Sequence, residues 1–249
     1  MQRSIDFNCD LGEGCANDAD VMPFISSANI ACGAHAGDIA SMRATLRLCA
    51  MHGVSAGAHP GYADREHFGR RALALSRDQI RSLLHEQLER IAEIALVEGV
   101  ALAHVKPHGA LYNQAAADVA LADAVAEAVR AFDPQLILVG LANSQLTSAG
   151  IRHGLHVADE AFTDRRYRSD GSLAARGQAG AVIDSADDAI AQALAIVRGE
   201  NITSIDGAAL HVHADTLCLH GDRSDAVAFA GALRNALDAA GVNVQGLRR

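Results

Sequence analysis

The chain has 249 residues, of which half are hydrophobic and a fifth are charged, and its formal net charge at pH 7 is −9. That length is ample for one α/β domain with a sizeable core, and this composition excludes a disordered chain. The acidic balance, without a cluster of basic residues, excludes typical nucleic-acid binding, and no apolar run approaches the roughly 18 residues of a membrane span.

Apolar strand-like runs alternate with amphipathic helical stretches along the chain. Ser76 and Gln79 form a capping box, and Gly53 and Gly99 each follow a helical stretch, as is typical of helix ends. In chain order, the predicted elements are a strand at 4–11, a helix at 38–52, a strand at 54–58, a helix at 76–98, a strand at 100–105, a helix at 118–131, a strand at 136–141, a helix at 144–153, a strand at 155–161, a helix at 184–198, candidate strands at 210–213 and 216–219, and a helix at 225–240.

Repeated strand–helix units predict a parallel sheet, and no linker divides the chain, so we expect one domain over residues 1–249. Polar side chains follow nearly every predicted strand. This is typical of a barrel, whose strand ends converge on one face, whereas an open sheet gathers such residues at one switch point. The sequence therefore favours an α/β fold with a single-domain (β/α) barrel, distorted, with fewer or more than eight strands.

The first group of polar residues lies in the segment NCDLGEG at 8–14. Asn8 and Asp10 share one face of the strand through its two-residue period, and the glycines beside Glu13 allow a tight turn. These carboxylates could bind a metal, transfer a proton or bind a substrate amine. The alternative is an ordinary Asp/Gly turn after a strand.

The segment ANIACGAHAGD at 28–38 contributes Asn29 and His35. Its small residues let the backbone approach a ligand. Asp38 can cap the helix that follows, and the N-terminus of that helix suits an anion. The alternative is that Asp38 is only a cap.

His59 lies where the second predicted strand breaks into a turn, in the segment GAHPGY at 57–62. Arg70 and Arg71 follow in the segment FGRR at 68–71. A guanidinium binds a carboxylate or a phosphate through two parallel hydrogen bonds, so either arginine could anchor such a group. For one of the two, an ordinary surface position is the alternative.

The segment HVKPHGALYN at 104–113 holds the one lysine among 21 basic residues. The ammonium of Lys106 could stabilise a developing oxyanion or a phosphoryl group, and His108 could move protons near neutral pH. His104 is typical of a buried core histidine. We expect Lys106→Ala to abolish activity and to leave the fold intact.

Two acidic residues follow later strands. Glu160 opens the segment EAFTDRRY at 160–167 and is a candidate catalytic carboxylate, while Asp222 in LHGD at 219–222 could orient a base or cap the last helix. A Walker nucleotide site is excluded because Lys106 is followed by proline.

The five cysteines indicate a reducing compartment. Their number is odd and no CxxC pair occurs, which argues against a disulfide framework or a zinc knuckle. Met1 leads directly toward the first predicted strand without a leader pattern. We therefore expect a cytoplasmic protein that binds neither nucleic acid nor a membrane.

Taken together, these segments resemble the LamB/YcsF family. The resemblance covers nearly the whole chain in family order and rests on NCDLGEG, SSANIACGAHAGD at 26–38, GAHPGY, FGRR, HVKPHGALYN, EAFTDRRY and LHGD. The chain departs from the family pattern at Ala34, where an aromatic residue is usual, and at Ala63, where proline usually follows the tyrosine. The resemblance implies a barrel of the glycoside hydrolase/deacetylase type.

The resemblance also implies hydrolysis of 5-oxo-L-proline to L-glutamate, coupled to cleavage of ATP, which we expect to act with Mg²⁺. It implies a complex with the 5-oxoprolinase subunits B and C, and the sequence does not indicate which subunit binds ATP. Residue chemistry assigns catalysis to Asp10, Lys106, His108 and Glu160, and substrate binding to Asn8, Glu13, Asn29, His35, His59, Arg70, Arg71 and Asp222.

Two alternatives stay open at this stage. A metal-dependent, deacetylase-like hydrolase would use Asp10, His59 and His108 as ligands of a divalent cation. A non-catalytic subunit would hold 5-oxoproline or ATP while its partners carry out the chemistry.

Overall fold

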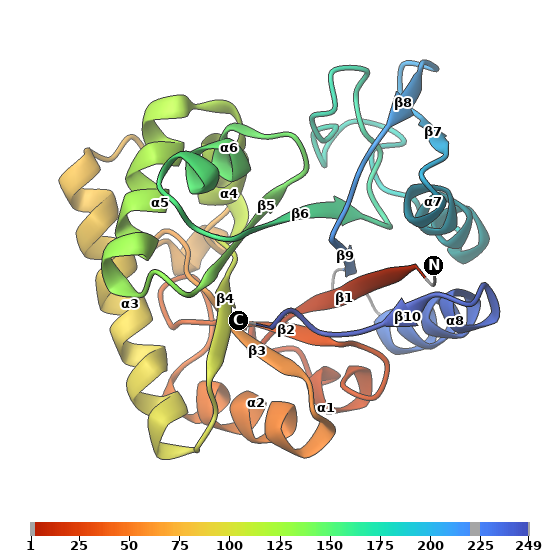
Figure 1. Ribbon diagram of the computed structural model, residues 1–249. Coiled ribbons are helices and arrows are strands. Elements are labelled where there is room, and N and C mark those ends of the chain that lie inside the picture. Colours follow the sequence, from red (N-terminus) through yellow and green to blue (C-terminus); the bar gives the residue numbers. More distant parts are fainter. Residues whose placement is uncertain (1–2, 220–224, 249) are drawn as a thin grey trace.

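Seven parallel strands close into a barrel in the computed structural model, which describes residues 3–219 and 225–248 (Figure 1). Each strand pairs with the next, and the last pairs with the first and closes the ring. In order around the barrel, the strands are β1 (Ser4–Leu11), β2 (Ser27–Ala31), β3 (Ser55–His59), β4 (Leu102–Val105), β5 (Ile137–Leu141), β6 (Val157–Phe162) and β9 (Thr216–Leu219). The expectation of a barrel that departs from eight strands is confirmed.

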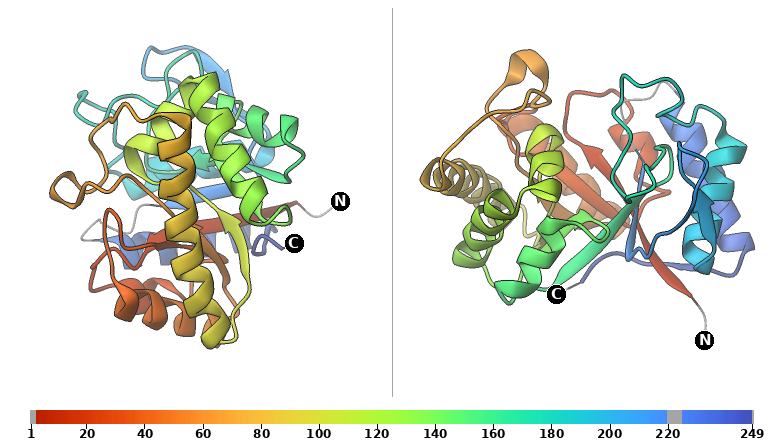
Figure 2. Two further views of the ribbon diagram at one scale, coloured as in Figure 1. Left: turned by 90° about the vertical axis from the view of Figure 1, so that its left-hand side faces the viewer. Right: turned by 90° about the horizontal axis from the view of Figure 1, so that it is seen from above.

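Helices lie outside the ring of strands, as the two further views show (Figure 2). The longest, α3, packs beside α5, and α5 packs beside α6. None of the described helices is long and apolar enough to cross a membrane. The helices are α1 (Asp18–Val21), α2 (Ile39–His52), α3 (Arg77–Val97), α4 (Gly109–Ala117), α5 (Val119–Phe132), α6 (Gln145–Arg152), α7 (Ala186–Arg198) and α8 (Ala226–Ala239), with a short 3₁₀ turn at Arg65–His67.

The helix ends follow the local signals in the sequence. Asp38 accepts a hydrogen bond from the Ser41 amide at the start of α2, and Gly53 ends that helix in the left-handed conformation. The capping box of Ser76 and Gln79 starts α3. These helices therefore begin and end within about two residues of the prediction, the usual uncertainty of helix boundaries.

One predicted strand lies outside the barrel. The segment 210–213 contributes to β8 (Ala209–His211), which pairs antiparallel with β7 (Asn201–Thr203) in a separate two-stranded ribbon. The short β10 (Asn243–Val244) pairs with the first residues of β1. The barrel therefore closes through β9 alone among the late strands that the structure describes.

Polar side chains cross the interior of the barrel. Asn29 on β2 accepts a hydrogen bond at 2.8 Å from Nε2 of His104 on β4, so the contact passes β3. Gly57 on β3 makes this contact possible, because a Cβ atom there would overlap the imidazole of His104. Burial lowers the pKa of His104 to about 3, so its ring is neutral at pH 7, as expected for a core histidine.

Candidate active site

A buried carboxyl group anchors the polar interior. Asp6 on β1 accepts hydrogen bonds from Ser26 at 2.7 Å, Ser27 at 2.6 Å and Thr216 at 2.5 Å. Burial raises the pKa of Asp6 to about 6, although the three hydroxyl groups act in the opposite direction. Because the Thr216 hydroxyl donates to Asp6, its oxygen accepts from the Asn8 amide at 2.6 Å. This contact fixes the orientation of Asn8.

The Asn8 side chain connects both sides of the barrel interior. Its Nδ2 donates to Oε1 of Glu160 on β6 at 3.0 Å. Its Oδ1 accepts from Nδ2 of Asn29 on β2 at 2.7 Å and from Nζ of Lys106 at 3.2 Å. The oxygen of the Asn8 amide therefore accepts from Asn29 and Lys106, and its nitrogen donates to Glu160.

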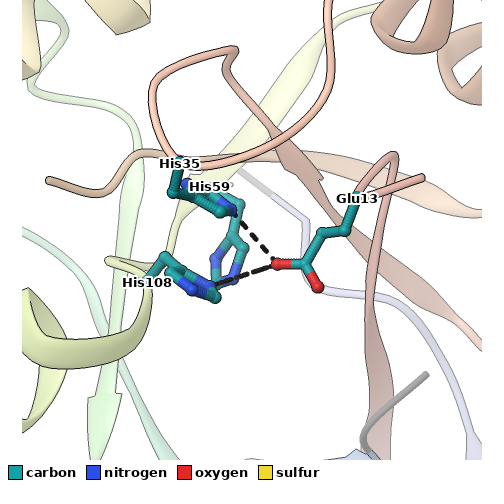
Figure 3. A group of neighbouring side chains, drawn as sticks. All are labelled: Glu13, His35, His59 and His108. Carbon is teal, nitrogen blue, oxygen red and sulfur yellow. Dashed lines mark hydrogen bonds and ion pairs between the residues drawn. The ribbon is translucent and has the colours of Figure 1, made fainter. Parts of the chain in front are cut away.

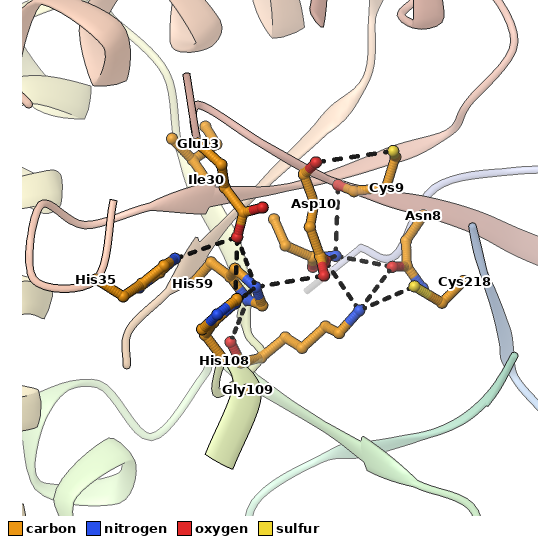
Figure 4. Close-up of polar contacts among 12 residues, drawn as sticks. Asn8, Cys9, Asp10, Glu13, Ile30, His35, His59, His108, Gly109 and Cys218 are labelled. Carbon is orange, nitrogen blue, oxygen red and sulfur yellow. Dashed lines mark hydrogen bonds and ion pairs between the residues drawn. The ribbon is translucent and has the colours of Figure 1, made fainter. Parts of the chain in front are cut away.

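Lys106 is 2% exposed and lies between two carboxylates. Its Nζ is 2.9 Å from Oδ1 of Asp10 and 2.7 Å from Oε1 of Glu160. Asn8 and the sulfur of Cys218, both at 3.2 Å, complete the surroundings of this ammonium group (Figure 4). Burial opposes the charged form, but Asp10 and Glu160 outweigh it and hold the pKa of Lys106 well above its ordinary value.

Three imidazoles converge on the carboxylate of Glu13 (Figure 3). Oε1 of Glu13 is 3.1 Å from Nε2 of His35, 3.1 Å from Nδ1 of His108 and 3.7 Å from Nε2 of His59. The rings of His35 and His108 are stacked with their centroids 3.7 Å apart. One ligand atom from each of these four residues lies within 4.8 Å of the others, so the group could hold a metal ion.

The pKa values of the three histidines and of Glu13 are shifted in different directions. Burial lowers the pKa of His35 to about 4 and also lowers the pKa of His108, in both cases against the pull of Glu13. For His59, burial also favours the neutral ring, but Asp10 outweighs it and raises the pKa. Burial likewise opposes ionisation of Glu13, but its imidazole partners outweigh that effect and lower its pKa.

Backbone carbonyl groups orient two of the rings. The Lys106 carbonyl accepts from Nδ1 of His59 at 2.8 Å, and the Phe68 carbonyl accepts from Nε2 of His108 at 2.9 Å. Phe68 has a left-handed backbone with φ of 54°. At Gly69, also left-handed, a Cβ atom would lie 3.0 Å from Cδ2 of His108, so glycine leaves room for the ring.

A cavity of about 750 Å³ opens beside this network. Arg165 lines it and is 6% exposed. One Nη2 hydrogen bond reaches the Ala174 carbonyl at 2.5 Å, while Nε of Arg165 has no hydrogen-bond partner among the described residues. The network contributes Asp10, Glu13, His59, Lys106 and His108 to the wall, and Arg70, Tyr112, Phe162, Ser172 and Arg176 also line it.

Most of the site residues predicted from the sequence meet in this network. Arg70 lines the cavity, whereas its neighbour Arg71 is 3.4 Å from Asp64 and does not line it. Asp222 lies outside the described residues. The residues that the network brings together are Asn8, Asp10, Glu13, Asn29, His35, His59, Lys106, His108 and Glu160.

The prediction missed three residues that shape the site. Arg165 stands in the segment EAFTDRRY, but two consecutive arginines in a polar loop give no sign of which one is buried. Tyr112 lines the cavity from α4, and burial, together with Glu160, raises the pKa of its hydroxyl well above the ordinary value. For Asp6, the only signal in the sequence was the two-residue period of the strand, which places it on the same face as Asn8.

Relatives of known sequence match nearly the whole chain. The A subunit of 5-oxoprolinase from Erwinia tasmaniensis (strain DSM 17950 / CFBP 7177 / CIP 109463 / NCPPB 4357 / Et1/99) is 51% identical over 240 residues, which cover 96% of this chain and 98% of that protein. The family described as the LamB/YcsF family matches residues 5–249.

Solved structures agree with this relationship. A lactam utilization protein from Thermus thermophilus superposes with a TM-score of 0.92 at 40% identity and covers 98% of this chain and 99% of its own. The peptidoglycan deacetylase PdaC from Bacillus subtilis shares the fold, with a TM-score of 0.52 at 10% identity over 99% of this chain and 88% of its own. By both its sequence and its barrel, the chain belongs to the LamB/YcsF family.

Proposed function

We propose that this chain is the A subunit of an ATP-dependent 5-oxoprolinase, which hydrolyses 5-oxo-L-proline to L-glutamate with cleavage of ATP. The observation that carries the proposal is the 51% identity to a protein named as the A subunit of 5-oxoprolinase, over 96% of this chain and 98% of that protein. The lettered name supports a complex with partner subunits, which we identify as B and C. All five cysteines are thiols rather than disulfides, which suits the cytoplasm.

The reaction explains why ATP is required. Opening a five-membered lactam releases an amine that stays at high effective molarity beside its own carboxyl group, so re-closure competes with opening. Transfer of the terminal phosphoryl group of Mg²⁺–ATP to the amide oxygen would make the ring carbon a better electrophile. Water then adds to that carbon with the help of a general base, and the ring C–N bond breaks as the nitrogen takes up a proton. Hydrolysis of the resulting acyl phosphate by a second water then releases L-glutamate and phosphate.

The cavity offers an anchor for the substrate carboxylate. Arg165 lines the cavity and is 6% exposed. Its Nε makes no hydrogen bond within the described part of the chain but is itself buried, so a ligand would meet the terminal nitrogens of the guanidinium group. A buried guanidinium with donors to spare binds a carboxylate strongly, because few water molecules compete. Arg70 is a second cationic group on the cavity wall. We assign the 5-oxoproline carboxylate to Arg165.

Asp10 and His59 are the groups that suit base catalysis. Oδ2 of Asp10 is 3.4 Å from Nε2 of His59, and both residues line the cavity. Asp10 is held close to Lys106, whose positive charge favours the ionised carboxylate that a base requires. His108, 2.9 Å from His59, can take part in the same proton transfer.

Lys106 and Glu160 act mainly by positioning. The ammonium group of Lys106 has three hydrogens and already faces four acceptors, Asn8, Asp10, Glu160 and Cys218. A substrate oxygen would have to replace one of them. Glu160 is fully buried and does not line the cavity, so its role is to hold Lys106 and Asn8.

The test is 5-oxoproline-dependent ATP hydrolysis in a mixture of this chain with its partner subunits, which are added one at a time. The proposal expects turnover only when the chain is present, and Arg165→Lys should raise the KM for 5-oxoproline more than it lowers kcat. Arg168→Lys, at an exposed position in the same loop, is the matched control. Turnover by the partner subunits alone would refute the proposal. If the chain binds 5-oxoproline or ATP but turnover does not require that binding, the result would support a non-catalytic role.

A further inference from the structure

In two of the three clustered imidazoles, those of His59 and His108, one ring nitrogen donates a hydrogen bond to a backbone carbonyl group. Nδ1 of His59 is 2.8 Å from the carbonyl oxygen of Lys106, and Nε2 of His108 is 2.9 Å from the carbonyl oxygen of Phe68. A carbonyl oxygen only accepts hydrogen bonds, so in each neutral ring the hydrogen lies on that nitrogen. The other ring nitrogen of each histidine then presents a lone pair.

Those two lone pairs face each other. Nε2 of His59 and Nδ1 of His108 are 2.9 Å apart, and Oε1 of Glu13 lies 3.7 Å from the first and 3.1 Å from the second. Three acceptors at these distances repel one another unless a cation lies among them. A proton can bridge only one pair of the three atoms at a time, whereas a metal ion can bind all three.

His35 supplies a fourth ligand. Its Nε2 is 3.1 Å from the same Glu13 oxygen, and its side chain is fully buried. A tetrahedral Zn²⁺ site with bonds of about 2.0–2.1 Å holds its ligand atoms about 3.4 Å apart. Four of the six separations among the ligand atoms, between 2.9 and 3.7 Å, lie on both sides of that value, and all six are within 4.8 Å. Side-chain shifts of up to about 1 Å would therefore admit the ion.

The surroundings also suit a metal site. Backbone carbonyls that accept from the far nitrogen of a ligating histidine are the usual outer shell of such sites, because they fix the ring and its tautomer. Here two of the three rings have that partner. Asp10 is a less suitable ligand than Glu13, because its Oδ1 already lies 2.9 Å from the ammonium group of Lys106.

We propose that Glu13, His35, His59 and His108 form a binding site for a divalent transition-metal ion, with Zn²⁺ as the best fit to three imidazoles and one carboxylate. The site lies in the cavity wall, since Glu13, His59 and His108 line the cavity. The proposal goes beyond the 5-oxoprolinase assignment and does not depend on it. With the ion bound, His59 and His108 would be ligands, and Asp10 would remain as the base assigned above.

The experiment measures metal binding directly. The full chain is purified without added metal, stripped with a chelator, and titrated with Zn²⁺ by calorimetry and with Co²⁺ by visible absorption. We expect one ion per chain, a higher melting temperature with Zn²⁺, and the intense Co²⁺ bands of a four-coordinate site. Absence of binding at millimolar Zn²⁺, or the weak bands of a six-coordinate Co²⁺, would overturn the proposal.

Variants then identify the ligands. Glu13→Gln and His35→Asn should each weaken Zn²⁺ binding by more than about 100-fold, the upper end of the loss caused by outer-shell changes. His85→Asn, at an exposed position on α3, is the matched control and should bind as the wild type does. Asp10→Asn should still bind one ion. Loss of binding in Asp10→Asn with full binding in Glu13→Gln would contradict the ligand set; if a variant fails to fold, the Co²⁺ spectrum of the wild type decides.

Discussion

Replacing Lys106 with methionine should reveal how strongly the buried charges depend on one another. The side chain is 2% exposed, and its Nζ lies 2.9 Å from Asp10 and 2.7 Å from Glu160. Methionine keeps a flexible chain of similar length and removes the positive charge. Asp10 and Glu160 would then lie in a buried region without the ammonium group between them, which the sequence-based expectation of an intact fold did not take into account.

The magnitude follows from proton uptake. One of the two carboxyl groups must bind a proton in the folded variant, and at pH 7 a carboxyl with an ordinary pKa near 4 does so at a cost of about 4 kcal/mol. This agrees with the roughly 3–5 kcal/mol lost when one partner of a buried pair is removed. The same protonation costs only about 1.4 kcal/mol at pH 5. The destabilisation of Lys106→Met should therefore shrink by roughly 2–3 kcal/mol between pH 7 and pH 5.

Urea unfolding of wild type and variant at the two pH values measures this difference. Arg81→Met is the matched control, because Arg81 is exposed and its contact with Asp78, at 3.4 Å, lies at the surface. Adding Glu160→Gln to Lys106→Met should recover part of the lost stability, since only one carboxylate then remains. A destabilisation below about 1 kcal/mol at pH 7, or one that does not change with pH, would refute this reasoning.

Three further predictions concern the interior. The pKa of Asp6 in the folded chain, about 6, lies above its ordinary value of 3.8, so the free energy of unfolding should fall as the pH rises from about 4 to 6. In Asp6→Asn, urea unfolding should show this fall reduced by up to about 3 kcal/mol. The same pH profile in variant and wild type would contradict the prediction. Gly57→Ala should cost about 1–3 kcal/mol because the new Cβ overlaps His104, whereas Gly177→Ala, with open space around it, should cost less; equal melting temperatures would argue against the overlap. Of the five thiols, only Cys15 is not fully buried, so a thiol reagent should modify one cysteine rapidly in the native chain and none rapidly after Cys15→Ser.

Signals that depend on neighbouring residues were readable from the sequence. The caps at Asp38 and Ser76 and the glycine at 53 mark helix ends within one turn of chain, and each was predicted correctly. The alternation of Asn8 and Asp10 likewise follows from the strand period, and both side chains lie in one network as predicted.

Features that depend on distant residues were not readable. The segment 210–213 has strand character, but only the packing of the whole chain decides that it pairs in a ribbon outside the barrel. Arg70 and Arg71 are adjacent and chemically equivalent, and the position of Asp64 in the fold decides which of them pairs away from the cavity. Glu13 was predicted as a site residue, but its three histidine partners come together only through contacts between β-strand ends far apart in the chain.

A crystal structure of the chain with 5-oxo-L-proline tests the central claim most directly. The account predicts electron density for the lactam in the cavity of about 750 Å³, with its carboxylate on Arg165 and its ring within hydrogen-bond distance of Asp10 or His59. Density for the ligand at another surface, with this cavity containing solvent alone, would contradict the account.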